Sequence, residues 1–249
     1  MSVAHYPSID CPPTVNEVTL LECLSRVQDP ELDESIVDLG FVQAIRLRDR
    51  EASVTLRLPT SWCAINFAFV MAEDVRSALL AADGIDRVTV RLGDHCAAAD
   101  IEEAVNNGKP FVAAFPHNGG RDLAALRTIF LRKGFLIRQE RLLRELLTRG
   151  LSMGDIAQLN IGTMAVGRNE FRPEIASLPR YLERRAELGL DCSSHAALVV
   201  DQEGAAVLEE RLEQYFQRIR TVRVAMEANA SICRAALASR NNMNSGRQQ

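Results

Sequence analysis

The sequence predicts an α+β protein, in which a small N-terminal helix–strand–strand–helix–strand domain is followed by a mainly α-helical C-terminal domain. Two observations predict this division. Before residue 92, apolar residues change between helical spacing and the two-residue alternation that is typical of strands. Beyond residue 120, helical spacing dominates in long stretches rich in leucine, alanine and arginine. The two patterns therefore indicate two domains with different architectures.

The N-terminal domain is predicted over residues 15–92, after a proline-containing flexible arm at residues 1–14. Helical spacing of apolar residues ends at Asp29-Pro30, and a charged turn at 48–51 separates two alternating segments that predict a hairpin. Gly84 ends the second helical segment. The predicted elements are a helix over 15–27, strands over 41–47 and 52–58, a helix over 65–82 and a strand over 87–92. This order fits a sandwich in which helices cover one face of a three-stranded sheet.

The remaining sequence predicts a connector, a helical domain and a tail. The connector spans 93–120 and includes a short helix over 97–106. The helical domain spans 121–240, and the polar residues 241–249 are expected to form a disordered tail. Within the domain, helices are predicted over 121–149, 175–188 and 206–240, around a short strand over 197–200.

Composition narrows the classes of function. The chain has 249 residues, of which 47% are hydrophobic, which is sufficient for substantial cores. Its net charge of −4 and pI near 5.7 argue against a nucleic acid as the main partner. Neither a signal peptide nor an apolar run long enough to span a membrane is found, so we expect a cytoplasmic protein.

The cysteines are scattered along the chain. No Cys-x-x-Cys pair is present, so reduced thiols are expected rather than a disulfide framework. A zinc ribbon or a self-contained ferredoxin-type cluster would show clustered ligands. Any cluster would therefore be shared between chains or bound transiently. The six cysteines are at positions 11, 23, 63, 96, 192 and 233.

Cys63 is the first candidate for chemistry, because it follows a predicted strand and begins a long apolar helical stretch. A helix N-terminus offers unpaired N–H groups and the positive end of the helix dipole, so we expect a lowered thiol pKa there. Such a thiolate is a nucleophile or a metal ligand. The alternative is that Cys63 is a small buried apolar residue.

Three short sequence motifs lie in the same region as this cysteine. They are Asp29-Pro30-Glu31, Val37-Asp38-Leu39-Gly40 and the turn Pro59-Thr60-Ser61-Trp62-Cys63-Ala64. On the basis of these motifs, roughly residues 16–92 resemble the iron–sulfur cluster assembly domain of bacterial SufT and PaaD and of the eukaryotic cytosolic iron–sulfur targeting factor. The turn departs from the family, because Pro59 stands at its usual threonine position and Ala64 at its usual proline position.

The resemblance implies a maturation factor that is not an enzyme. It would bind iron or an iron–sulfur cluster transiently and act with cluster-assembly proteins on a client apo-enzyme. The implied site contains Cys63 with Thr60, Glu31 and Asp38. Among the acidic residues, we expect Asp29 and Asp38 to be structural, since they lie at turns where carboxylates accept backbone N–H groups. Glu31 is expected to lie close to Cys63.

Asp94 and His95 form a second candidate group directly after the last strand of the domain. With Cys96 they would offer oxygen, nitrogen and sulfur ligands within three residues, a set that iron and zinc both accept. Asp94 and His95, with Cys63, are the predicted metal ligands. The alternative is that Asp94 caps the following helix. The Asp-His stretch and Trp62-Cys63-Ala64 also resemble accessory proteins of soluble di-iron monooxygenase gene clusters, which implies a di-iron hydroxylase as the client.

Other functions remain open at this point. The segment from Arg149 to Leu159 resembles part of a helix-turn-helix, which would suit a DNA-binding regulator, although Ser152 with Asp155 also forms a plain helix N-cap. A thiol enzyme would need a base, and all four histidines are distant from Cys63 in the sequence. A cluster bridged by Cys63 from two subunits would require a homodimer.

Overall fold

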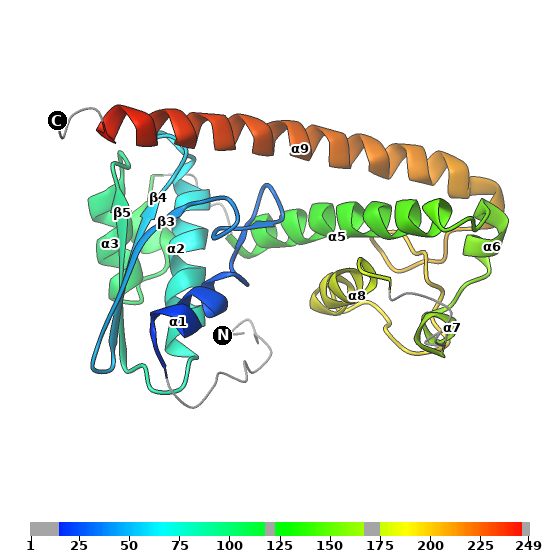
Figure 1. The fold of residues 1–249 in the computed structure, drawn as a ribbon, viewed down its shortest axis with the longest axis horizontal. Coiled ribbons are helices and arrows are strands. Elements are labelled where there is room, and N and C mark those ends of the chain that lie inside the picture. Colours follow the sequence, from blue (N-terminus) through cyan, green and yellow to red (C-terminus); the bar gives the residue numbers. More distant parts are fainter. Residues whose placement is uncertain (1–14, 118–122, 167–174, 246–249) are drawn as a thin grey trace. The chain divides into compact units, whose positions relative to one another are not determined.

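The computed structural model describes residues 15–117, 123–166 and 175–245. The chain divides into two compact units, residues 1–123 with 229–249 and residues 124–228. The predicted arm at 1–14 lies outside the described residues. The last helix, α9 (Glu209–Ser245), contributes to both units and includes the first residues of the predicted tail (Figure 1). The other domain limits drawn from the sequence stay predictions.

The first unit contains the predicted three-stranded sheet. Strands β3 (Val42–Arg48) and β4 (Glu51–Arg57) form the antiparallel hairpin, and β5 (Arg87–Gly93) pairs with β4 in parallel. In β4 and β5 buried apolar residues alternate with more exposed ones, as the two-residue period of a strand requires. The parallel register places these apolar residues opposite one another, so they form one buried face.

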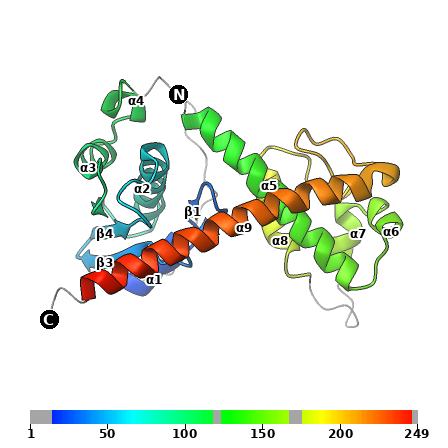
Figure 2. The same ribbon diagram turned by 90° about the horizontal axis from the view of Figure 1, so that it is seen from above.

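Helices close this face into a core. Helix α2 (Ile65–Leu80) and helix α3 (Ala98–Asn106) pack against each other and against β5, and α1 (Glu17–Leu24) contacts α2 and β3 (Figure 2). A short helix, α4 (Phe111–Ala114), follows α3. The predicted order of helix, strand, strand, helix and strand is confirmed. A small additional hairpin, β1 (Gln28–Asp29) with β2 (Glu34–Ser35), lies between α1 and β3 in the sequence.

The end of α9 belongs to the same core. Ala230 is fully buried and Leu237 is 5% exposed, and both pack within the apolar cluster of the first unit. These residues lie seven positions apart, which places them on one face of the helix. The sequence pattern predicted the helix but not that its last part would join the N-terminal domain.

The second unit is helical, as predicted. It contains α5 (Leu123–Thr148), α6 (Met153–Ala157), α7 (Ile161–Val166), α8 (Leu178–Glu187) and the first part of α9. Its core includes fully buried apolar side chains from α5, α8 and α9. The arrangement confirms a fold that combines a small α+β domain with mainly helical structure.

The predicted strand over 197–200 is wrong, because this segment forms only two isolated bridges, Asn160 with Ala197 and Val200 with Ala206. Buried side chains bind its carbonyl groups instead. Arg185 donates to the carbonyl oxygen of Ala197 at 2.8 Å, and Gln139 donates to that of Val200 at 2.9 Å. Because side chains satisfy these backbone groups, no neighbouring strand is needed.

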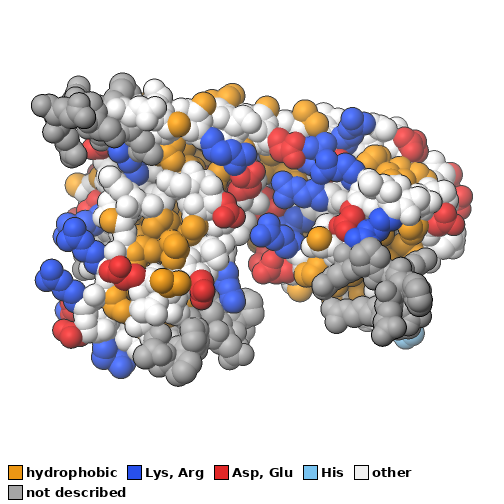
Figure 3. All heavy atoms as spheres, viewed as in Figure 1, with side chains coloured by type: hydrophobic (Ala, Val, Ile, Leu, Met, Phe, Trp, Pro, Cys, Tyr) orange, Lys and Arg blue, Asp and Glu red, His pale blue; other side chains and the backbone are white. Residues whose placement is uncertain are grey.

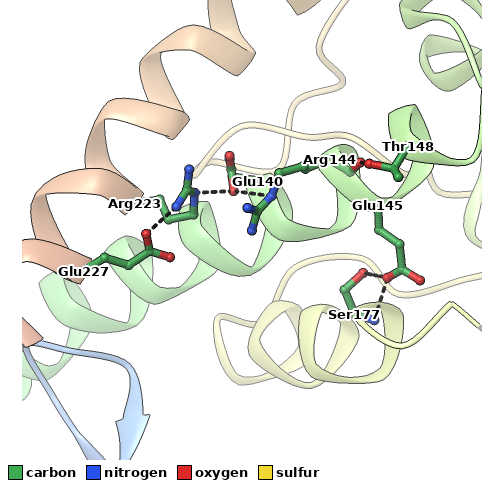
Figure 4. Close-up of polar contacts among 7 residues, drawn as sticks. All are labelled: Glu140, Arg144, Glu145, Thr148, Ser177, Arg223 and Glu227. Atoms are coloured by element: carbon green, nitrogen blue, oxygen red, sulfur yellow. Dashed lines mark hydrogen bonds and ion pairs between the residues drawn. The ribbon is translucent and has the colours of Figure 1, made fainter. Parts of the chain in front are cut away.

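Ion pairs and capping contacts connect the helices of this unit (Figure 4). Glu140 on α5 is fully buried, and its carboxylate lies 2.7 Å from the Nε atom of Arg223 on α9. Glu145, one turn further along α5, accepts hydrogen bonds from the backbone N–H and the hydroxyl of Ser177, at 3.0 and 2.5 Å. Since Ser177 is the N-cap of α8, Glu145 fixes the start of that helix.

No helix in the part of the chain that the structure describes is long and apolar enough to cross a membrane. On the face drawn in Figure 3, acidic and basic side chains lie beside one another over the helical unit.

Candidate functional site

Cys63 lies in the turn that connects β4 to α2. Its backbone N–H donates to the carbonyl oxygen of Thr60 at 3.4 Å, and α2 begins at Ile65 with Ala64 as N-cap. The Cys63 side chain is half-buried, whereas Thr60 is exposed and Trp62 is 80% exposed. The turn therefore holds the thiol near the surface, directly after the exposed Trp62 that a binding partner can reach.

A second loop, at residues 94–97, fixes this turn. His95 is buried, and its Nε2 atom lies 2.9 Å from the carbonyl oxygen of Cys63. Its Nδ1 atom accepts the N–H of Ala97 at 3.2 Å, so Nε2 is the nitrogen that donates to Cys63. The N–H of Cys96 donates to the carbonyl oxygen of Ser61 at 2.9 Å. The structure thus brings His95 to Cys63 through the backbone of the turn.

The carboxylate of Asp94 does not contact the cysteine turn in this way and pairs with arginines instead. One carboxylate oxygen lies 3.3 Å from Arg57 and 3.6 Å from Arg240, the latter on α9. The structure therefore pairs Asp94 with arginines, and both ring nitrogens of His95 have backbone partners. Their role as metal ligands stays a prediction, and it would require these contacts to be exchanged for contacts with iron.

The Asp29-Pro30-Glu31 motif forms the turn of the β1–β2 hairpin. Asp29 is buried, and its Oδ1 atom accepts the backbone N–H groups of Glu31 and Leu32, each at 2.9 Å. This is the structural role expected for Asp29. Burial nevertheless raises the pKa of Asp29 to about 6. Asp38 is exposed, at the turn before Gly40.

Asp29 and Glu31 both act on the Cys63 thiol. Burial, followed by the negative charge of Asp29, the thiol of Cys233 and the charge of Glu31, raises the pKa of Cys63 to about 12. The structure thus brings Glu31 close to Cys63, whereas Thr60 contributes a backbone carbonyl to the turn. The expectation of a lowered thiol pKa is wrong, because burial beside acidic groups outweighs the start of α2.

Cys233 was not among the site residues predicted from the sequence. It lies on α9, half-buried, and packs with Cys63 against the same apolar core. Burial, Asp29 and Glu31 raise its pKa as well, while Arg234 opposes them. Only the tertiary fold brings this face of α9 to the cysteine turn.

The arrangement is an acidic, thiol-containing site with an incomplete set of ligands. Two thiols and two carboxylates repel one another when ionised, so a bound cation would stabilise their ionised forms together. Within residues 15–117, 123–166 and 175–245, no three His, Cys, Asp or Glu side chains lie close enough together to hold a metal ion.

The segment near Ser152 has a structural explanation. Ser152 is the N-cap of α6, a helix of five residues, and it exchanges hydrogen bonds with Asp155 in a capping box. This is the plain N-cap alternative left open by the sequence. A helix of little more than one turn offers few residues to a DNA groove.

Comparisons with known proteins give one family match, which contains the cysteine turn, and two relatives. A family model described as iron–sulfur cluster assembly protein matches residues 17–92. An iron–sulfur cluster carrier protein of Deinococcus radiodurans is 38% identical over 80 residues, which cover 32% of this chain and 22% of that protein. An uncharacterised protein of Methanocaldococcus jannaschii is 32% identical over 91 residues, which cover 36% of this chain and 93% of that protein.

Proposed function

The chain belongs to the iron–sulfur cluster assembly protein family through residues 17–92, and we propose that it carries an iron–sulfur unit on Cys63 to a client apo-enzyme. The main support is the position of Cys63, half-buried in a fixed turn beside Asp29 and Glu31. Thiolate is the usual protein ligand of iron–sulfur clusters. The similarity to a carrier protein from Deinococcus radiodurans supports the same role, and the matched region covers 22% of that protein.

A carrier differs from an enzyme and from a protein with a resident cluster, since it must release what it binds. A closed four-ligand site would retain iron too firmly for transfer. The cysteine turn offers one thiol with carboxylates nearby, and additional ligands would come from the cluster sulfides and from the donor or the client. A second copy of the chain could supply a further Cys63, which would make the loaded form a homodimer.

The client is proposed to dock at the cysteine turn and the helical unit. Trp62 presents a largely exposed indole directly before Cys63, and an exposed aromatic side chain is a common anchor in protein interfaces. Following the resemblance of Trp62-Cys63-Ala64, we propose a di-iron monooxygenase component as the client. Transfer would take place in the cytoplasm, with cluster-assembly proteins as donors.

Anaerobic reconstitution tests the carrier site. The purified chain is incubated with ferric iron, sulfide and a thiol reductant, desalted, and analysed for bound iron, bound sulfide and visible absorption. We expect iron and sulfide on the native chain and their loss in Cys63→Ala. Cys192→Ala is the matched control, because Cys192 is an exposed cysteine of the helical unit.

Circular dichroism at far-ultraviolet wavelengths establishes whether the variants are folded. Equal amounts of iron on native and Cys63→Ala protein would contradict the proposed site. No iron on any form would contradict the carrier function and favour a scaffold that binds the apo-enzyme.

A further inference from the structure

The final turns of α9 lie against the loops that form the candidate site. Arg240 donates to the carbonyl oxygen of Leu58 at 2.5 Å, five residues before Cys63. Arg234 forms an ion pair with Glu34, three residues after Glu31. Because one contact reaches the cysteine turn and the other reaches the acidic hairpin, this part of α9 bridges both components of the site.

Cys233 lies between these contacts on the inward side of the helix. It follows the buried Ala230 by three residues and precedes the buried Leu237 by four, so all three share one face. Leu237 also approaches Gly40 so closely that a Cβ atom added to the glycine would lie 3.6 Å from a leucine methyl group. The contacts at residues 234, 237 and 240 therefore hold α9 in a fixed position, with Cys233 directed to the apolar core against which Cys63 also packs.

The electrostatic environment agrees with this placement. Asp29 and Glu31 raise the pKa values of both thiols, and Cys233 contributes to the raised pKa of Cys63. The remaining thiol of the family-matching region, Cys23, is 2% exposed within the core and is not available as a ligand.

We propose that Cys63 and Cys233 together form a two-thiolate half-site for one iron of the cargo cluster. This inference rests on the proposed function and adds a ligand from outside residues 17–92. Each thiol loses its proton to solvent as its sulfur–iron bond forms, so binding requires no oxidant or reductant. Two cluster sulfides complete the four ligands of that iron, as in a [2Fe–2S] cluster with two cysteines per iron.

The half-site explains how a cluster can be both held and released. The second iron remains open to thiolates of a donor or a client, which can then replace Cys63 and Cys233 one at a time by ligand exchange. Release of Cys233 also requires no change in the fold of residues 17–92, because this ligand is on a separate helix.

Reconstitution of single serine variants tests the half-site. We compare bound iron and sulfide for the native chain, Cys63→Ser, Cys233→Ser and the control Cys192→Ser. The half-site predicts that Cys233→Ser loses at least as large a fraction of its iron as Cys63→Ser, while Cys192→Ser binds as the native chain does. If Cys63→Ser loses iron and Cys233→Ser retains it, the half-site is wrong and the carrier function stands. If both variants retain iron, both proposals are wrong.

Phenylarsine oxide gives a readout that is independent of iron. Its arsenic atom forms two bonds to neighbouring thiols with release of one water molecule, and a bound pair resists competition by a monothiol. Intact mass spectrometry should show one arsenical per native chain, retained in excess mercaptoethanol and absent from Cys63→Ser and from Cys233→Ser. An arsenical retained equally by native and Cys233→Ser protein would show that the two thiols do not act as a pair. Circular dichroism of each variant excludes loss of fold as the cause.

Discussion

At the scale of single residues, two neighbours of Cys63 have separate roles. His95 fixes the turn from inside, and Trp62 is exposed beside the thiol. The sequence identified His95 as a candidate ligand from its residue type, but its hydrogen bonds depend on which loop packs against the cysteine turn. That information is tertiary, so local sequence patterns could not supply it.

We expect His95→Ala to loosen the cysteine turn. The change removes the hydrogen bond to the Cys63 carbonyl group and leaves a small cavity, which together destabilise the unit by about 2 kcal/mol. Greater motion of the turn should make Cys63 react faster with iodoacetamide, measured by peptide mass spectrometry after timed quenching.

His195→Ala is the control for this experiment, because His195 is an exposed histidine of the helical unit. An unchanged alkylation rate and an unchanged melting temperature in His95→Ala would show that His95 does not hold the turn.

We expect Trp62→Ala to separate cluster binding from cluster transfer. The indole is 80% exposed, so its removal should leave stability and bound iron within error of the native chain. Loss of an aromatic anchor weakens docking by about 1–2 kcal/mol, which corresponds to transfer roughly ten-fold slower at limiting acceptor concentration. The measurement is the rate at which the apo-acceptor gains its visible spectrum. Native transfer rates in the variant would exclude Trp62 from the docking surface.

At the scale of secondary-structure elements, the helices of the second unit are linked by carboxylates of α5. Glu145 accepts three hydrogen bonds from Ala176 and Ser177 and pairs with Arg149 at 2.6 Å. Burial alone would raise the pKa of Glu145, but the hydrogen bonds from Ser177, Arg149 and Ala176 outweigh it, and the pKa is lowered. The ionised carboxylate therefore stabilises the folded protein.

We expect Glu145→Gln to lower the stability of the helical unit by about 1 kcal/mol at neutral pH, a reduced value because this side chain is partly exposed. A lowered carboxyl pKa contributes stability above the ordinary value of 4.5, and this contribution is lost as pH falls through the lowered pKa. Thermal denaturation of native and variant protein should therefore differ by a few degrees at pH 7 and converge once the pH falls below the lowered pKa of Glu145. A difference that persists unchanged at low pH would contradict this explanation.

The sequence pattern predicted most of these elements, and its errors have physical causes. Regular apolar spacing identified helices α1, α2, α3, α5, α8 and α9 and the three strands of the sheet within a few residues, because one face of each is buried. The short helices α4, α6 and α7 were not among the helices predicted from apolar spacing. The strand expected over 197–200 was wrong, because buried Arg185 and Gln139 bind its backbone from distant positions in the sequence. Short apolar runs do not carry that information.

At the scale of the whole molecule, the principal feature is that α9 contributes to both compact units. The sequence predicted the helix and the cysteine turn, each from local pattern. It did not predict that Arg234, Leu237 and Arg240 would bind the end of α9 to the first unit, because these partners are nearly two hundred positions away. For the same reason, the sequence did not assign Cys233 to the site of Cys63.

The most direct test of the carrier proposal is transfer of a loaded cluster to an apo-protein. The reconstituted native chain is mixed anaerobically with apo-ferredoxin in the presence of excess iron chelator, and visible circular dichroism follows the acceptor cluster. Direct hand-over predicts that the acceptor gains its cluster in the presence of chelator, and that Cys63→Ala, taken through the same loading procedure, transfers none. If the chelator takes all of the iron while the acceptor remains apo, the chain does not act as a carrier.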